Sequence, residues 1–320
     1  MLRLNDHWLW DFWFARDGDD YHVFYLQAPR AIGDPDERHW NASIGHAVSQ
    51  DLRAWWVLPD ALGPGETGSW DDRSTWTGSI LRATGRWHLF YTGVSTREGG
   101  RVQRIGVATS DDLISWDKDA ASPLLEADPR WYEKLDPTAW HEEAWRDPWV
   151  FWHAPTGDYR MFLTARASAG PPDGRGVVGH ARSSDLRRWQ VLPPLTRPGE
   201  YGHMEVPQLV EMNGRYYLLF SVYEWAHSAR RRQRAEAVSG THYIVADRPL
   251  GPYESLSDEF LAADAHGSRY AGKILQAPDG GWVYLSFSQY PDGDEFSGEL
   301  SDPVPLVVTP DGHLRITTVQ

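Results

Sequence analysis

One pattern of apolar and polar positions occurs five times along the chain. Each copy is a turn that contains glycine, followed by a strand of alternating aromatic and aliphatic residues: RDGDDYHVFYL, ATGRWHLFYTG, PTGDYRMFLTA, MNGRYYLLFSV and PDGGWVYLSFS. A glycine turn before a strand of period-two hydrophobicity is typical of a β-hairpin. The turn glycines are Gly18, Gly85, Gly157, Gly214 and Gly280, between 57 and 72 residues apart. This spacing predicts an internal repeat of roughly 65 residues.

A third strand follows the hairpin in three of the copies and ends in a shared motif. The motif is Ser-x-Asp-Leu-x-x-Trp around Asp51, Asp112 and Asp185, and the fourth copy has the variant THYIVADRPLGPY. Five units of four short antiparallel strands fill the whole chain and predict an all-β fold, a five-bladed β-propeller with four-stranded antiparallel blades. We expect residues 1–320 to form this single domain, with no C-terminal β-sandwich.

Acidic residues recur at the start of the strand that each unit places innermost. These strands run side by side around the central channel of a propeller, so their first residues converge at one mouth. Asp11, Asp147 and Glu205 hold this place in the first, third and fourth units, where the second and fifth have WTGS (76–79) and RYAG (269–272). The sequence therefore predicts three carboxylates at equivalent positions around one mouth, with aromatic residues beside them.

Three carboxylates in a low-dielectric mouth repel one another unless one is protonated or a ligand shares them. Carboxyl groups whose pKa values are pushed apart are what cleavage of a glycosidic bond requires, with one ionised group at the anomeric carbon and one protonated group at the leaving oxygen. A metal cage is the competing interpretation, but hard cations need oxygen ligands and have no use for the surrounding tryptophans. We therefore expect an active site at one mouth of the channel, with no metal and no cofactor.

Composition narrows the class of partner. The chain has 18 tryptophans and 14 tyrosines, and an aromatic face with a polar edge suits a sugar ring, although large β-folds also use aromatics in strands. A net charge of -14 argues against nucleic acid and anionic membranes as partners. The absence of cysteine and of any apolar run of about 18 residues favours a soluble, cytoplasmic protein. The expected partner is a small carbohydrate substrate. The sequence patterns do not indicate whether the protein is a monomer or an oligomer.

The motifs resemble those of the five-bladed propeller glycosidases of glycoside hydrolase families 32 and 68, the β-fructosidases, invertases and levansucrases. WTGS is similar to the family motif Trp-Ser-Gly-Ser, WRDPWVF contains Arg-Asp-Pro, and MEVPQLVEMNGRYY is similar to the Glu-containing acid motif. LWDFW resembles the Trp-Asp-x-Trp nucleophile motif of family 68 more than the corresponding motif of family 32. The four motifs stand in the family order, and the resemblance covers essentially the whole chain. It implies a retaining β-fructosidase.

The resemblance also implies roles for single residues. Asp11 corresponds to the nucleophile that forms a covalent fructosyl intermediate, Glu205 to the general acid and base, and Asp147 to the stabiliser of the transition state. The residues expected to bind the substrate, taken from these motifs and from the strand starts beside them, are Trp10, Trp76, Ser79, Arg146, His203 and Tyr270.

The sequence departs from the family pattern at several positions. Val206 replaces the cysteine usual in family 32, Thr77 replaces a serine, and Phe14 stands where family 68 has proline. His203 replaces the acidic residue common in family 68, which leaves transfructosylation open. The expected reaction is hydrolysis of sucrose, a fructo-oligosaccharide or a decorated fructoside, with transfer to another sugar as a variant.

Two alternatives stay open from the sequence. The fold also resembles that of family 43, whose arabinofuranosidases and xylosidases invert and need a wider gap between the two working carboxyl groups. A sugar-binding propeller without catalysis is the other alternative, which the three intact acids disfavour. The basic segment AHSARRRQRAEAV (226–238) is interpreted either as a solvated insertion or as a rim element whose arginines meet an anionic group on the ligand.

Overall fold

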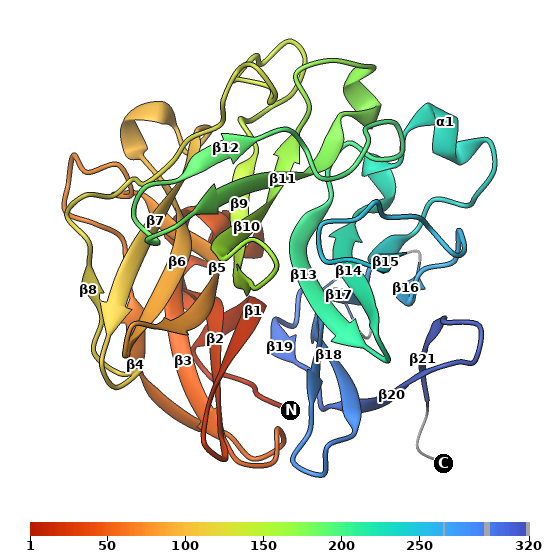
Figure 1. Cartoon of the computed structure of the whole chain (residues 1–320). Coiled ribbons are helices and arrows are strands. Elements are labelled where there is room, and N and C mark those ends of the chain that lie inside the picture. The colour runs from red at the N-terminus through yellow and green to blue at the C-terminus, as the bar shows by residue number, and fades with distance from the viewer. Residues whose placement is uncertain (265, 291–294, 318–320) are drawn as a thin grey trace.

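The computed structural model describes residues 1–264, 266–290 and 295–317, and it confirms the five-bladed β-propeller. Figure 1 shows the blades following one another around a common centre as the colours run from red to blue. Within each blade the strands pair antiparallel, from the innermost to the outermost. Blade 1 consists of β1 (His7–Asp17), β2 (Asp20–Pro29), β3 (Ser43–Ser49) and β4 (Trp56–Leu62). Blade 2 consists of β5 (Ser74–Ala83), β6 (Arg86–Val94), β7 (Gln103–Ser110) and β8 (Asp117–Lys118).

The other three blades repeat this arrangement. Blade 3 consists of β9 (Trp145–His153), β10 (Asp158–Arg166), β11 (Gly176–Ser183) and β12 (Gln190–Leu192). Blade 4 consists of β13 (Glu205–Met212), β14 (Arg215–Val222), β15 (Ser239–Ala246) and β16 (Ala262–Asp264). Blade 5 consists of β17 (Arg269–Gln276), β18 (Trp282–Ser288), β20 (Val304–Val308) and β21 (Leu314–Ile316), with β19 (Glu299–Leu300) paired to β18 beside this path.

Two kinds of turn recur in the blades: the glycine turn between the first and second strands, and the Ser-x-Asp-Leu turn after the third strand. The five turn glycines adopt left-handed backbone angles, with φ between 61° and 84°, which glycine reaches without steric cost. In the Ser-x-Asp-Leu-x-x-Trp motif, Asp51, Asp112 and Asp185 each accept hydrogen bonds from the backbone amides two and three residues later. Such side-chain bonds to the following amides are typical of an Asx-turn.

The ring closes between the last blade and the first residues of the chain. Leu2 and Leu300 exchange two backbone hydrogen bonds, of 3.1 and 3.0 Å, and the Leu9 amide donates to the Gly298 carbonyl at 3.0 Å. The innermost strands β1 and β17 are also in contact. The five innermost strands therefore form a closed ring around the channel.

Helical segments are short and lie in the connections between strands. They are η1 (Arg30–Ile32), η2 (Pro35–Asn41), η3 (Thr96–Glu98), η4 (Pro172–Gly174), η5 (Glu224–Ala226) and α1 (Ala229–Arg232). Over the described ranges, no helix is long and apolar enough to cross a membrane.

Each innermost strand contains a β-bulge near its start. The pairing register shifts directly after Trp10 in β1, Trp76 in β5, Arg146 in β9, Glu205 in β13 and Tyr270 in β17. A bulge breaks the regular alternation of side chains and re-aims the residue that it contains. The five bulges therefore decide which side chains face the mouth of the channel.

Candidate active site

The bulges allow two consecutive residues of one strand to face the same cavity. Trp10 and Asp11, Trp76 and Thr77, and Arg146 and Asp147 all line one cavity at the channel mouth, whereas neighbours in a regular strand point to opposite faces. In β9 this needs a left-handed backbone at Asp147, whose φ is 57°. Non-glycine residues in this conformation are held there by their surroundings and cluster at functional sites.

Glu205 is out of step with the two aspartates by one residue. It directly precedes its bulge, as Arg146 and Tyr270 do, whereas Asp11 and Asp147 lie within theirs. In blade 4 the position of Asp147 belongs to Val206, which shares its left-handed backbone with a φ of 49°. The sequence analysis placed the three carboxylates at equivalent positions of their blades. In the structure only Asp11 and Asp147 are equivalent, and Glu205 lies one residue earlier in its strand.

The cavity has a volume of about 280 Å³. Eight of the nine residues predicted for the site line it: Trp10, Asp11, Trp76, Arg146, Asp147, His203, Glu205 and Tyr270. The structure places Ser79 outside the lining. Its buried hydroxyl accepts a hydrogen bond from the Val150 amide at 3.1 Å, so it joins β5 to β9.

Glu205 is bonded to two donors. Arg146 Nη2 donates to its Oε1 and the Tyr270 hydroxyl donates to its Oε2, both at 2.6 Å. Burial and the Glu205 charge raise the pKa of Tyr270 well above its ordinary value, so this hydroxyl remains a proton donor. The carboxylate is therefore held in one orientation by two charge-assisted contacts.

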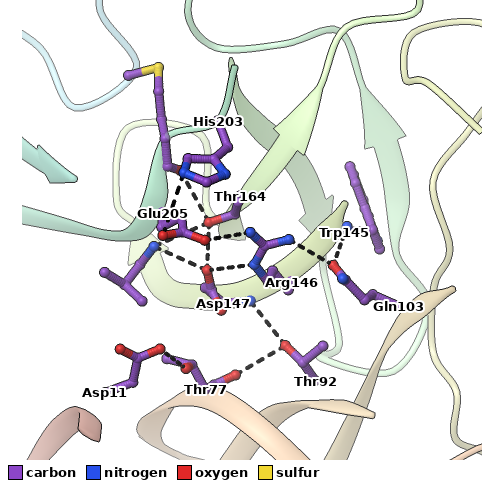
Figure 2. A network of polar contacts seen from close by, with 12 residues as sticks. Asp11, Thr77, Thr92, Gln103, Trp145, Arg146, Asp147, Thr164, His203 and Glu205 are labelled. Carbon is purple, nitrogen blue, oxygen red and sulfur yellow. Dashed lines mark hydrogen bonds and ion pairs between the residues drawn. The ribbon is translucent and has the colours of Figure 1, made fainter. Parts of the chain in front are cut away.

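Asp147 is more deeply buried. Its Oδ2 accepts from the Thr164 hydroxyl at 2.6 Å and from the Val206 amide at 3.1 Å, and Arg146 Nε lies 3.5 Å away. Burial raises the pKa of Asp147, and the Arg146 charge opposes this rise. Figure 2 shows Arg146 on one side of Asp147 and Glu205, with dashed contacts to both, and Asp11 set apart beside Thr77.

Asp11 has a different environment from the other two acids. Its Oδ2 accepts a hydrogen bond from Thr77 at 2.7 Å. Burial, and next the charge of Asp147, raise its pKa to about 7, while Thr77 and the Lys273 ammonium act in the opposite direction. The three carboxyl groups of the cavity thus have different partners: Thr77 for Asp11, Thr164 and the Val206 amide for Asp147, and Arg146 and Tyr270 for Glu205.

Lys273 is a buried cation that the sequence analysis did not select. It lies on β17 and donates from Nζ to the Val206 carbonyl at 2.6 Å. Burial lowers its pKa to about 8, and the charges of Asp11 and Asp147 oppose this fall. The sequence signal that could have identified Lys273 is its position among apolar residues in the innermost strand of blade 5.

Two histidines of the cavity are neutral. Burial lowers the pKa of His203 and of His39 far below the ordinary value, and the positive charge of Arg146 adds to both effects. His203 Nε2 lies 3.7 Å from Glu205 Oε2, and neither of its ring nitrogens has a hydrogen-bond partner in the described part of the chain. A neutral imidazole with both nitrogens free can serve either as donor or as acceptor for a hydroxyl group.

Tyr270 and two aromatic residues that the sequence analysis did not select, Tyr223 and Trp225, form one wall of the cavity. Tyr270 and Tyr223 stack at 4.2 Å with an interplanar angle of 16°, and Tyr223 and Trp225 at 6.3 Å with 12°. Trp225 is 53% exposed although it lines the cavity. An exposed indole at the end of an aromatic stack offers a flat surface for a ring-shaped ligand.

The segment η2 brings four further residues to the cavity: Asp36, Arg38, His39 and Trp40. Trp76 Nε1 donates to the His39 carbonyl at 2.7 Å, which holds this segment against blade 2. The basic segment 226–238 does not reach the cavity lining. Within the described ranges, no group of three or more His, Asp or Glu side chains is arranged to hold a metal ion.

Comparison with known families gives one match over most of the chain. The family model described as the glycosyl hydrolases family 32 N-terminal domain matches residues 12–302.

Among curated proteins, sucrose-6-phosphate hydrolase of Bacillus subtilis is 27% identical over 293 residues, which are 88% of this chain and 54% of that protein. The extracellular sucrase of Zymomonas mobilis is 27% identical over 84% of this chain and 73% of that protein. The insoluble β-fructofuranosidase isoenzyme CWINV6 of Arabidopsis thaliana is 27% identical, over 85% of this chain and 50% of its own. The chain thus spans about half the length of the first and third of these relatives.

Solved structures share the fold. The inulosucrase from Halalkalicoccus jeotgali bound to kestose superposes with a TM-score of 0.76 at 24% identity, over 98% of this chain and 88% of that chain. The β-fructofuranosidase catalytic domain of Microbacterium saccharophilum superposes with a TM-score of 0.76 at 18% identity, over 99% and 82%. At this level of identity the likeness establishes the propeller architecture.

Proposed function

Because this chain belongs to glycosyl hydrolase family 32, whose N-terminal domain model matches residues 12–302, we propose that it is a retaining hydrolase of β-fructofuranosides. The substrate is a small fructoside such as sucrose, a fructo-oligosaccharide or a decorated fructoside. The observation that carries the proposal is the meeting of Asp11, Asp147 and Glu205 in one cavity, each with different partners.

In the first half of the proposed reaction, the ionised Asp11 attacks the anomeric carbon of the fructosyl unit. The bond to the leaving oxygen breaks as Glu205 gives its proton to that oxygen, and a covalent fructosyl ester forms on Asp11. Asp11 suits this role because Thr77 fixes one of its oxygens and no guanidinium is bonded to it. Lys273 favours the ionised form against the larger effects of burial and of the Asp147 charge, and with a pKa of about 7 Asp11 is largely ionised only above neutral pH.

In the second half, Glu205 takes a proton from a water molecule, which attacks the anomeric carbon and releases Asp11. Arg146 and Tyr270 each donate a hydrogen bond to Glu205 and hold its carboxyl group in one orientation for this step. Asp147, fixed by Thr164 and Val206, is placed to accept hydrogen bonds from ring hydroxyls.

A substrate panel followed by proton NMR tests the proposal. Sucrose, sucrose 6-phosphate, levan and inulin oligomers and aryl arabinofuranosides are compared side by side, and the anomer that forms first is recorded. Release of β-fructofuranose first, from at least one fructoside, is expected. An inverted first product contradicts the double displacement and favours a family 43-like reaction. Sugar binding without turnover of any glycoside favours a non-catalytic propeller.

A cytoplasmic location stays a prediction. It is supported by the absence of cysteine from the chain, whereas one similar protein is named an extracellular sucrase. Fractionation of the native source, with detection by an antibody against the chain, tests the prediction directly.

A further inference from the structure

A second cavity lies between blade 4 and the segment that links blade 3 to it, apart from Asp11, Asp147 and Glu205. It has a volume of about 620 Å³, against about 280 Å³ for the carboxylate cavity. Its walls come from the segment after β12, from β14 and β15, from α1, and from the connection after β15. Of the described residues, none lines both cavities. A volume of this order accommodates a ligand of sugar size.

Part of the lining is apolar. The apolar and aromatic residues are Leu195, Tyr201, Met204, Phe220, Ile244 and Tyr253. Such a wall, with polar groups at a few positions, is typical of a small-molecule site and not of a solvated gap between blades.

Positive charge is concentrated in the rest of the lining. Five arginines face three carboxylates: Arg197, Arg215, Arg231, Arg234 and Arg248 against Glu200, Asp247 and Glu254. The whole chain carries a net charge of -14. An excess of cations in one concave place on an acidic protein attracts anions locally.

Two of these arginines have no side-chain partner among the described residues. Arg231 Nη1 binds Asp258 at 2.9 Å and Arg234 pairs with Glu200, so their charges are balanced within the protein. Arg197 and Arg248 make no ion pair and no side-chain hydrogen bond with any described residue, and both are exposed. Their guanidinium groups are free to bind a ligand oxygen, and guanidinium matches phosphate in bidentate geometry.

Three buried polar groups of the lining also have no partner among the described residues, and one of them is His242 Nδ1. The Tyr201 hydroxyl and Arg231 Nε have no hydrogen-bond partner within the part of the chain described, although their side chains are almost fully buried. The Arg231 guanidinium lies over the Tyr201 ring at 4.9 Å from its centroid. Buried polar groups without partners are uncommon in folded proteins and mark places where a ligand or water completes the structure.

We propose that this cavity binds a phosphate monoester of sugar size. The phosphate binds Arg197 and Arg248, and the sugar body lies against the apolar and aromatic part of the lining. This site is separate from the carboxylate cavity and does not depend on the proposed hydrolysis.

The segment 201–205 forms a wall common to both cavities. Tyr201 and Met204 line the arginine-rich cavity, and His203 and Glu205 line the carboxylate cavity. The Met204 carbonyl accepts a hydrogen bond from Thr164, whose hydroxyl also lies 2.6 Å from Asp147. We therefore extend the proposal: a ligand packed against Tyr201 and Met204 changes the apparent KM of the carboxylate site. This extension alone rests on the proposed function.

Isothermal titration calorimetry with glucose 6-phosphate tests the binding site, with glucose and inorganic phosphate as comparison ligands. The double variant Arg197→Ala/Arg248→Ala is expected to lose at least tenfold in affinity. The matched control Arg187→Ala removes another exposed arginine, on blade 3, and should bind like the parent protein. Asp11→Asn, which marks the carboxylate cavity, should also leave the affinity unchanged.

The outcomes are distinct. No binding of glucose 6-phosphate, equal affinity in the double variant, or an affinity changed by Asp11→Asn overturns the site. Equal binding of inorganic phosphate and glucose 6-phosphate overturns the part of the proposal that concerns the sugar body. A KM for sucrose that changes on saturation with glucose 6-phosphate in the parent, but not in the double variant, supports the extension. An unchanged KM despite proven binding overturns the extension alone.

Discussion

Arg146 donates from Nη2 to Glu205 Oε1 at 2.6 Å and so joins blade 3 to blade 4 across the channel mouth. The same guanidinium binds Glu142 at 2.6 Å and lies 3.5 Å from Asp147. One buried cation is thus shared by three carboxylates, which raises the pKa of the arginine still further. Asp11 has no such partner and depends on Thr77 and on the field of Lys273.

Replacing Arg146 by alanine is expected to destabilise the fold by about 3–5 kcal/mol, because Glu142 and Glu205 are left buried without their cation. Unpaired buried carboxylates have raised pKa values, so the loss should be smaller at pH 5 than at pH 8. Urea unfolding at both pH values measures it. The control Arg82→Ala removes an exposed ion pair with Asp17 and should cost little. An equal loss at both pH values contradicts the electrostatic explanation.

Asp11→Asn should lower turnover of sucrose by about a thousandfold or more, as loss of a nucleophile does. It should also raise Tm at pH 8. The folded-state pKa of about 7 lies above the ordinary 3.8, so burial of this group costs stability as pH rises from about 4 through 7. Asparagine removes that cost. Calorimetric scans at pH 4 and pH 8 should show a gain at pH 8 only, and a Tm below that of the parent protein at pH 8 would rule this out.

Glu205→Gln is expected to cause a comparable loss with sucrose, because no proton reaches the leaving oxygen. A fructoside with a nitrophenolate leaving group needs no such proton, so the formation of the intermediate should suffer much less. Burst kinetics with both substrates separate the two steps. Asp11→Asn is the matched comparison, since it should be equally inactive on both. An acid role is excluded if Glu205→Gln loses the same factor with either leaving group.

The acidic limb of the pH profile reports on Lys273. Its positive charge lowers the pKa of Asp11, so Lys273→Met should raise that pKa and move the acidic limb of kcat/KM to higher pH by about one unit. Lys118→Met is the control, because Lys118 pairs with Asp71 in blade 2, outside the cavity lining. A limb that stays in place while kcat alone falls would assign Lys273 a purely structural role.

Trp225→Ala should raise KM for oligosaccharides about three- to tenfold with little change in kcat, because an exposed platform binds ground state and transition state alike. The control is Trp152→Ala, which removes a similarly exposed indole on blade 3. Initial rates with sucrose and inulin oligomers measure the split between KM and kcat. If kcat falls and KM does not change, Trp225 is not a binding platform.

The sequence was sufficient for the architecture because the repeat lies in local patterns. Glycine turns with positive φ and the Asp-Leu turns after the third strands are set by neighbouring residues, so both can be identified without knowledge of the fold. The presence of Asp11, Asp147 and Glu205 at one mouth followed from the same repeat.

The exact positions of the side chains in the site could not be predicted from local sequence patterns. The one-residue offset of Glu205 depends on bulges, and bulges depend on pairing with the second strand. Trp225 reaches the cavity because the connection after β14 folds over the mouth. Lys273 does not line the cavity, but its charge acts on Asp11 because β17 closes the ring beside β1. Ser79 is turned toward β9 by the same kind of long-range contact.

The pairing of Leu2 with Leu300 joins two segments that lie far apart in the sequence. Residues near the N-terminus emerge first, yet their partner strand β19 is made only after most of the chain. Contacts so distant in sequence form late, because a large loop must close before they contribute. The mouth that holds Asp11 beside β17 therefore cannot be complete before the first strand of the fifth blade has been made.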